Sequence, residues 1–319
     1  MPMYTMVYDI TVGPYTVGIL DHVEVHRSVE LLADTAKIVL PASQFNAALN
    51  VEDKIKRGDF VSIGFGYEET GQALEFQGYV QRISTDDGSI TLECEDRLFL
   101  FRKAVPDTQQ KKVSLKDLLQ WVIDQTGTGL KLDCSYTWTY DNYVTSSATG
   151  YDVLKKVQEE SGADIYIDGD TLHVHAPGEK VGNEVLYDFS LNVEESDLTY
   201  RNAEDRKVKV VVKSLQPDGT VKEMEFGESD GDKVEVRANS TDSASMTSRG
   251  QAELKRRSYT GYDGSITTWL VPYIKPGDKA TLHDRDYEYK DGSYYVQSVT
   301  TTFGADGGKR KIELGFKLS

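Results

Sequence analysis

The sequence predicts a mainly β protein in which two related β-barrel-like domains flank a small α+β domain. The first observation is the alternation along residues 58–97, where Val61, Ile63 and Phe65 are separated by single small or polar residues. A period of two places every second side chain on the same face of a strand, so this stretch is predicted to form an antiparallel meander with one buried face. Asp86-Asp87-Gly88 supplies turn residues where the meander must reverse.

The second observation is that a similar stretch recurs near the C-terminus, over residues 275–316. Gly277-Asp278 corresponds to Gly58-Asp59, and Val296-Gln297 corresponds to Val80-Gln81. A supersecondary unit used twice predicts two similar β-domains in one polypeptide. Because the match is short and gapped, independent convergence on a common meander is the alternative.

The third observation is that helical spacing replaces strand alternation between the two copies. Residues 114–126 carry one apolar stripe and begin with a serine that suits an N-cap, which predicts an amphipathic helix. A second helix is predicted over residues 151–161, capped by Thr149. A hairpin over residues 164–176 follows. Residues 106–187 are therefore predicted to be the small α+β domain.

Domain boundaries are placed where polarity rises and proline interrupts the strand pattern. The first β-barrel-like domain is predicted to span residues 1–105, and the second to span residues 188–319 with one helix at Ser243–Arg257. Residues 42–49 are expected to form one or two helical turns. The other segments expected to be strands are residues 4–12, 19–27, 35–40, 208–212, 221–226 and 265–271.

Length and composition limit the class of protein. The chain has 319 residues, of which 39% are hydrophobic and 10% aromatic, which indicates a globular protein of two or three domains. No run of about 18 apolar residues occurs, and residues 1–15 lack the regions of a secretory signal, so synthesis in the cytoplasm without a signal peptide is expected. Of the two cysteines, Cys94 and Cys134, the first lies on the apolar face of its strand and is expected to be a packed, reduced thiol.

The strongly acidic balance argues against specific binding to nucleic acid. The formal net charge is −16, whereas contact with a phosphate backbone needs clustered lysine and arginine. The first interpretation is a solvated surface that keeps the protein soluble. The alternative is a face or channel lined with carboxylates that repels a passing polyanion.

The sequence contains no G-x-S-x-G, H-E-x-x-H or Walker A motif, so we expect no enzymatic activity, no catalytic or cofactor-binding residues and no cofactor. His173 and His175 lie two residues apart on a predicted strand, a spacing seen in zinc sites. No cysteine or further histidine lies nearby in the sequence, so an exposed strand face is preferred and no metal site is predicted. The same interpretation applies to His22 and His26.

Residues 284–288 resemble the start of a calcium-binding loop, with acidic side chains at every second position. Tyr289, however, occupies the position where such a loop needs glycine for its sharp turn. An ordinary polar turn is therefore preferred.

Several segments, taken in order, resemble the baseplate hub proteins of contractile phage tails, of the late control gene D type. The same order is similar to the N-terminal part of the VgrG spike proteins of type VI secretion. The order and spacing of the segments, across nearly the whole chain, carry the resemblance. They are residues 35–41 (TAKIVLP), 58–63 (GDFVSI), 76–83 (FQGYVQRI), 90–97 (ITLECEDR), 151–167, 276–278 and 292–299.

The resemblance implies a homotrimer in which two barrel-like domains per chain form a pseudo-sixfold ring. Such a ring would join a sixfold tail tube to a threefold central spike and continue the conduit, in the baseplate of a virion tail or a related injection machine. The implied partners are the tail tube protein, a central spike protein, other baseplate proteins and the tape measure protein. VgrG-like chains continue into an oligosaccharide-binding-type domain and a β-helical spike, whereas this sequence stops at Ser319, so a separate spike protein is expected.

Two alternatives come from other functional classes. A cell-wall glycan-binding module would use a platform of aromatic side chains, although packing against neighbouring strands is preferred for them. The aromatic residues concerned are Tyr136, Trp138, Tyr140 and Tyr143. A peptidoglycan hydrolase would need two carboxyl groups at a set separation in a cleft, and adjacent acidic pairs such as Glu68-Glu69 and Glu159-Glu160 are plentiful.

Overall fold

The computed structural model describes residues 4–41, 54–86 and 88–318. Strands hold 52% of the residues and helices 17%, so the predicted mainly β class is confirmed. The large sheet contains β1 (Met6–Val12), β2 (Tyr15–Thr16), β3 (His22–Ser28), β4 (Thr35–Pro41), β5 (Phe60–Tyr67), β6 (Gly71–Asp86), β7 (Ser89–Glu95), β13 (Glu184–Asp188), β14 (Glu195–Arg201), β18 (Gly261–Trp269), β19 (Lys279–His283), β20 (Gly292–Gly304) and β21 (Gly307–Lys317).

Three smaller sheets and three α-helices complete the described elements. The sheets are β8 (Thr108–Ser114) with β10 (Thr139–Thr145); β9 (Lys131–Cys134) with β11 (Asp164–Asp168) and β12 (Thr171–His175); and β15 (Val208–Leu215) with β16 (Val221–Gly227) and β17 (Asp232–Arg237). The helices are α3 (Leu115–Thr126), α4 (Gly150–Ser161) and α5 (Ser243–Arg257), with 3-10 turns η1 (Arg97–Phe101), η2 (Ala203–Arg206) and η3 (Glu288–Lys290).

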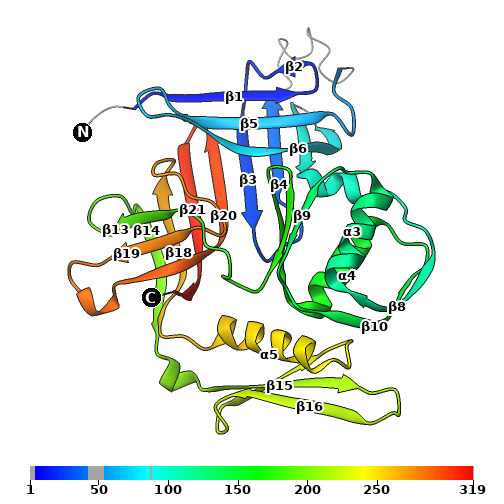
Figure 1. The fold of residues 1–319 in the computed structure, drawn as a ribbon. Coiled ribbons are helices and arrows are strands. Elements are labelled where there is room, and N and C mark those ends of the chain that lie inside the picture. Colours follow the sequence, from blue (N-terminus) through cyan, green and yellow to red (C-terminus); the bar gives the residue numbers. More distant parts are fainter. Residues whose placement is uncertain (1–3, 42–53, 87, 319) are drawn as a thin grey trace.

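The large sheet is continuous from one β-rich region to the other. Its main path runs β14-β18-β21-β20-β3-β4-β7-β6-β5-β1-β2, while β19 pairs with β20 and β13 pairs with β19. Figure 1 shows β1 and β5 across the top, β18 and β19 at the left, and α3 and α4 at the right. The join is the antiparallel pair of β3 and β20, in which Phe303 lies opposite Val23.

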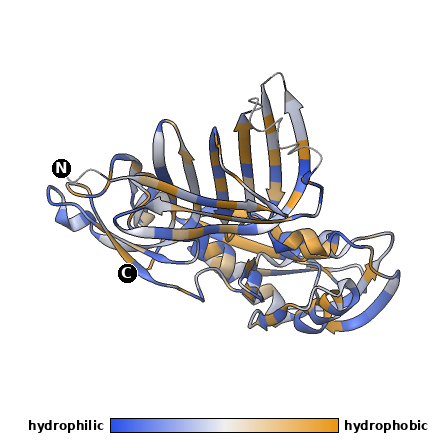
Figure 2. Cartoon of the chain, turned by 90° about the horizontal axis from the view of Figure 1, so that it is seen from above, coloured by the Kyte–Doolittle hydropathy of each residue, from blue (hydrophilic) through white to orange (hydrophobic). Residues whose placement is uncertain are grey.

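Each meander buries one face, as the alternation predicts. Val61, Ile63 and Phe65 of β5 are at most 1% exposed and belong to one apolar cluster with residues of β1, β3, β4 and β7. Cys94 is buried in the same cluster as a free thiol, as predicted. A second cluster lies between β13, β18, β19, β20 and β21. Polar and apolar bands alternate along the strands in Figure 2, which is the period-two pattern seen in space.

The two predicted helices in the middle of the chain are confirmed together with their caps. The Ser114 side chain accepts a hydrogen bond from the backbone N–H of Asp117 at the start of α3. At α4, Thr149 and Asp152 form a capping box, so two backbone N–H groups that lack a helical partner are satisfied. Gly127 ends α3 and Gly162 ends α4 in left-handed conformations, with φ of 63° and 71°, which glycine adopts without strain.

The hairpin β15–β16 and helix α5 share their apolar core with the middle of the chain. Val210, Val212 and Met246 belong to the same cluster as Leu118 and Val153. This core crosses residue 187, where the sequence pattern places a domain boundary. The division into residues 1–105, 106–187 and 188–319 remains a prediction.

Several elements were not expected from the sequence. They are short or lie at a sheet edge, where periodicity is weak: β2, β8, β9, β10, β13, β14 and β17. The helical turns expected over residues 42–49 lie outside the described residues. Within the part of the chain that the structure describes, no helix has the length and apolar character needed to cross a bilayer.

Candidate functional site

The turns that open the two meanders have the same side-chain hydrogen bond. Asp59 Oδ2 accepts the backbone N–H of Lys56 at 2.7 Å, and Asp278 Oδ2 accepts the backbone N–H of Lys275 at 3.0 Å. In both turns the aspartate N–H also donates back to the lysine carbonyl, at 3.0 and 3.1 Å. The two turns are therefore closed by the same reciprocal pair of hydrogen bonds.

The same turns are attached to the next strand of their meander in the same way. Gly58 N–H donates to the carbonyl of Val80 at 2.8 Å, and Gly277 N–H donates to the carbonyl of Val296 at 2.9 Å. The N–H of Val80 donates to the backbone carbonyl of Asp59, and the N–H of Val296 donates to that of Asp278, both at 2.9 Å. Both glycines have a left-handed φ, of 92° and 86°, which explains why glycine precedes aspartate in both copies.

Both meanders also carry a bulge at the same place. The pairing of β6 with β7 shifts register across Gln81, and the pairing of β20 with β21 shifts register across Gln297. A bulge re-aims a strand and increases its twist, so it is a specific feature of a sheet. The two meanders share the hydrogen bonds of the turn, the bonds from the turn to the next strand and the position of a bulge. These shared features favour duplication of one unit over independent convergence.

Side-chain contacts join the two meanders. Arg310 of β21 forms an ion pair with Glu75 of β6, with Nη2 2.7 Å from Oε1. Phe303 of β20 stacks on Phe65 of β5, with ring centroids 5.2 Å apart. The first meander and the second are therefore in direct contact through buried side chains.

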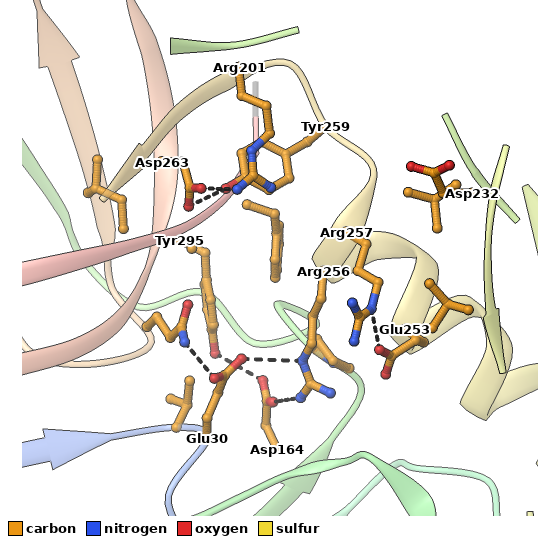
Figure 3. Close-up of a pocket in the computed structure, with 18 residues that line it drawn as sticks. Glu30, Asp164, Arg201, Asp232, Glu253, Arg256, Arg257, Tyr259, Asp263 and Tyr295 are labelled. Atoms are coloured by element: carbon orange, nitrogen blue, oxygen red, sulfur yellow. Dashed lines mark hydrogen bonds and ion pairs between the residues drawn. The ribbon is translucent and has the colours of Figure 1, made fainter. Parts of the chain in front are cut away.

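A cavity of about 500 Å³ lies between the second meander, α5 and the β15–β17 sheet. In Figure 3, Arg256 points to two carboxylates, with Nη2 2.7 Å from Asp164 Oδ1 and Nε 3.5 Å from Glu30 Oε1. The other labelled arginines are also paired, Arg257 with Glu253 and Arg201 with Asp263. Since each guanidinium already has a carboxylate, the cavity is a junction held by ion pairs rather than a site prepared for an anion.

The aromatic residues considered for glycan binding lie inside the protein. Tyr136, Trp138, Tyr140 and Tyr143 are each at most 6% exposed and belong to the core that includes α3 and α4. The Tyr140 ring packs on those of Trp138 and Tyr143, with centroids 5.9 and 4.9 Å away. The preferred interpretation of packing is confirmed, and a platform at these four residues is excluded.

His173 and His175 lie beside a carboxylate that the sequence pattern did not reveal. Asp133 of β9 lies opposite His173 in the parallel pair of β9 and β12. His175 is buried, so the preference for an exposed strand face is wrong at that residue. Within the described residues, these three side chains are the one group of three or more His, Cys, Asp or Glu whose ligand atoms all lie close enough to share a metal ion. Asp133 was missed because four-residue β9 is too short to show a period.

The other candidate residues have structural partners. His22 Nδ1 lies 2.9 Å from Asp21 Oδ2, and His26 Nδ1 lies 2.9 Å from Thr300 Oγ1, so they are not brought together in one site. Asp284 Oδ1 accepts the backbone N–H groups of Asp286 and Tyr287, at 3.0 and 3.1 Å. The polar-turn interpretation of residues 284–288 is thereby supported.

The acidic pairs considered for hydrolysis also make structural contacts. Glu69 accepts the backbone N–H of Thr5 at 2.9 and 3.0 Å. Glu160 accepts a hydrogen bond from the side chain of Asn239. Neither glutamate lines the cavity of Figure 3.

Comparison with solved structures identifies the fold. A tail protein from Neisseria meningitidis MC58 superposes with a TM-score of 0.69 at 13% identity, covering 98% of this chain and 97% of that one. The 43 kDa tail protein of prophage MuSo2 from Shewanella oneidensis gives 0.67 at 15% identity, over 96% and 97% of the two chains.

A third neighbour comes from a secretion machine. It is an E. coli component of the type VI secretion system, described as similar in structure to tail proteins of bacteriophage T4, with a TM-score of 0.60, 8% identity and coverage of 97% and 77%. No protein-family model matches the chain, and no curated protein matches it. The fold is thus that of phage tail proteins and related secretion components.

Proposed function

We propose that this chain is the structural hub of the baseplate of a contractile phage tail or a related injection machine. The observation that carries the proposal is the duplicated meander, with the same turn bonds at Asp59 and Asp278 and the same bulge at Gln81 and Gln297. Two equivalent units per chain and three chains per ring give six similar positions, which match the sixfold symmetry of a tail tube.

The sheet edges suit a closed assembly. The main path of the large sheet ends at β14, which among the described residues pairs with β18 alone, and a strand edge of this kind tends to pair with other chains unless it is covered. Large apolar side chains lie exposed near β13 and η3: Leu186, Leu191, Tyr287 and Tyr289, between 51% and 73% exposed. Cyclic trimers cover such edges and patches with neighbouring copies.

The proposed hub joins a tail tube protein to a spike protein and contacts other baseplate proteins and the tape measure protein. Its place is the tail of the virion or the baseplate of the machine. Acidic side chains facing the conduit would reduce adhesion of a polyanion, in line with the net charge of −16. A conduit surface that proves neutral or basic in a structure of the assembly would contradict this last point.

The role we propose is structural rather than enzymatic. The similarity of fold to tail proteins supports it, and the aromatic residues that would favour a glycan-binding module are part of the core. A peptidoglycan hydrolysis assay with the purified protein is expected to give no activity above the buffer blank.

Light scattering tests the assembly. The expected mass of the purified protein is three times the chain mass of 35.7 kDa. Should the protein remain a monomer at every concentration, and also after mixing with purified tube and spike proteins, the hub proposal would be wrong.

A further inference from the structure

We propose that Asp133, His173 and His175 bind one divalent transition-metal ion of the Zn²⁺ type, with one coordination position left open. This inference does not rest on the proposed hub function. It assigns a binding site to the small sheet of β9, β11 and β12, which is separate from the large sheet that contains the duplicated meanders.

The three potential ligand atoms already have the spacing of a metal site. Asp133 Oδ2 lies 3.3 Å from His173 Nδ1 and 3.3 Å from His175 Nε2, and the two nitrogens are 3.4 Å apart. Ligands bound to tetrahedral zinc at about 2.0–2.1 Å are separated from each other by about 3.3 Å. The three atoms therefore form one face of a tetrahedron of the right size.

The contact with Ser135 suits the tautomer of His175 that leaves Nε2 free to bind a metal ion. Ser135 Oγ lies 2.7 Å from His175 Nδ1, within hydrogen-bond distance. In the tautomer that carries its proton on Nδ1, His175 donates to the Ser135 oxygen. Nε2 of His175 is then unprotonated and faces Asp133 and His173. A second hydrogen bond that orients a histidine in this way is typical of metal ligands.

The cluster has acceptor atoms that need a cation. The lone pair of His175 Nε2 and the charge of the Asp133 carboxylate face each other at 3.3 Å, which is unfavourable without a positive group between them. Lys180 Nζ, 3.2 Å from Asp133 Oδ2, provides one cation at the exposed side of the cluster. A metal ion would replace it.

The surroundings leave one side of the site open. His175 is buried and the His173 ring stacks on Tyr166 with an angle of 16° between the planes, so both rings are held in place. The Asp133 side chain is 41% exposed and Lys180 is 52% exposed, so solvent or a partner side chain can reach the fourth position. Nitrogen and carboxylate ligands in this number suit zinc and the neighbouring divalent metals.

Cobalt and zinc titrations of the full-length protein, freed of metal with a chelator, test the proposal. We expect one equivalent of Co²⁺ to bind with the visible absorption of a low-symmetry, four-coordinate ion, and one equivalent of Zn²⁺ to displace it. Asp133→Asn and His173→Gln should abolish the absorption, and Ser135→Ala should weaken zinc binding about 10–100-fold. His22→Gln and His26→Gln are matched controls and should bind as the parent protein does.

Lys180→Met gives a result that a merely structural cluster would not produce. Removing the competing ammonium from Asp133 should tighten zinc binding, whereas loss of an ordinary ion pair would leave it unchanged. Circular dichroism of each variant shows whether it is folded, and Asp133→Asn, at a partly exposed position, keeps the test valid if His173→Gln does not fold. Absence of stoichiometric binding, or equal binding by Asp133→Asn, His173→Gln and the parent protein, would overturn the proposal.

Discussion

Arg310 and Glu75 form a buried, two-pronged ion pair between the second meander and the first. Nη2 lies 2.7 Å from Oε1 and Nη1 lies 3.1 Å from Oε2, and each side chain is 1% exposed. Thr301 Oγ1 accepts from Arg310 Nη1 at 3.0 Å, and the carbonyls of Leu270 and Ile274 accept from the same guanidinium. Such extra hydrogen bonds are what allow charges to be buried.

Arg310→Met should therefore destabilise the protein strongly, because it leaves the Glu75 carboxylate buried without its partner. We expect the free energy of unfolding in urea to fall by about 3–5 kcal/mol, and the double variant Glu75→Leu with Arg310→Met to recover most of this loss. Lys309→Met, next in sequence and paired with Glu194 at a more exposed position, is the control and should change stability by less than about 1 kcal/mol. Equal losses in Arg310→Met and Lys309→Met would show that the pair does not lock the meanders.

The two equivalent turn aspartates should differ in their contribution to stability. Asp278 is 2% exposed and accepts the backbone N–H groups of Lys275 and Asn183, whereas Asp59 is partly exposed and accepts that of Lys56. Alanine at position 278 removes a buried acceptor that serves two backbone N–H groups, so Asp278→Ala should cost about 2–3 kcal/mol and Asp59→Ala about 1 kcal/mol. Guanidinium denaturation measures both. A larger loss for Asp59→Ala would contradict the argument from burial.

Asp164, at the cavity of Figure 3, should make stability depend on pH. Burial raises the pKa of Asp164 to about 6, although Arg256 opposes the shift. The native state then holds a proton that the unfolded state has lost, so the stabilisation by Asp164 is largest below about pH 4 and is lost as the pH rises to about 6. As the pH rises from about 4 to about 6, the free energy of unfolding of the parent protein should fall by about 2–3 kcal/mol relative to that of Asp164→Asn.

Asp168 provides a control of opposite sign. Burial acts to raise its pKa, but hydrogen bonding and charge from Lys275 lower it overall. The contribution of Asp168 is therefore present above its unfolded pKa and is lost as the pH falls. Chemical denaturation of Asp164→Asn and Asp168→Asn between pH 3 and pH 7 should give pH dependences, relative to the parent protein, of opposite direction. The same direction in both variants would refute the assignment.

Local patterns predicted the local structure well. The alternation of Val61, Ile63 and Phe65 predicted a strand because it depends on neighbours in sequence, and the caps at Ser114 and Thr149 are equally local. The pairing of Arg310 with Glu75 and of His173 with Asp133 depends on strand order and register, which no local pattern contains.

The shared core of Met246 with α3 and α4 could not be predicted for the same reason. An apolar stripe shows which face of a helix is buried, but not which distant element covers it. The resemblance of several segments, in order, to phage-tail hub proteins indicated the class of fold. Composition alone is compatible with many kinds of β-rich protein.

Imaging of the assembled protein tests the central claim most directly. A three-dimensional reconstruction of the purified particle, alone or on its tail tube, shows how the duplicated meanders are arranged. The account predicts a ring of three chains with six similar lobes around a central channel, in which the unit containing Asp59 alternates with the unit containing Asp278. A ring of any other number of lobes, or a particle in which the two units do not occupy alternating positions, would contradict it.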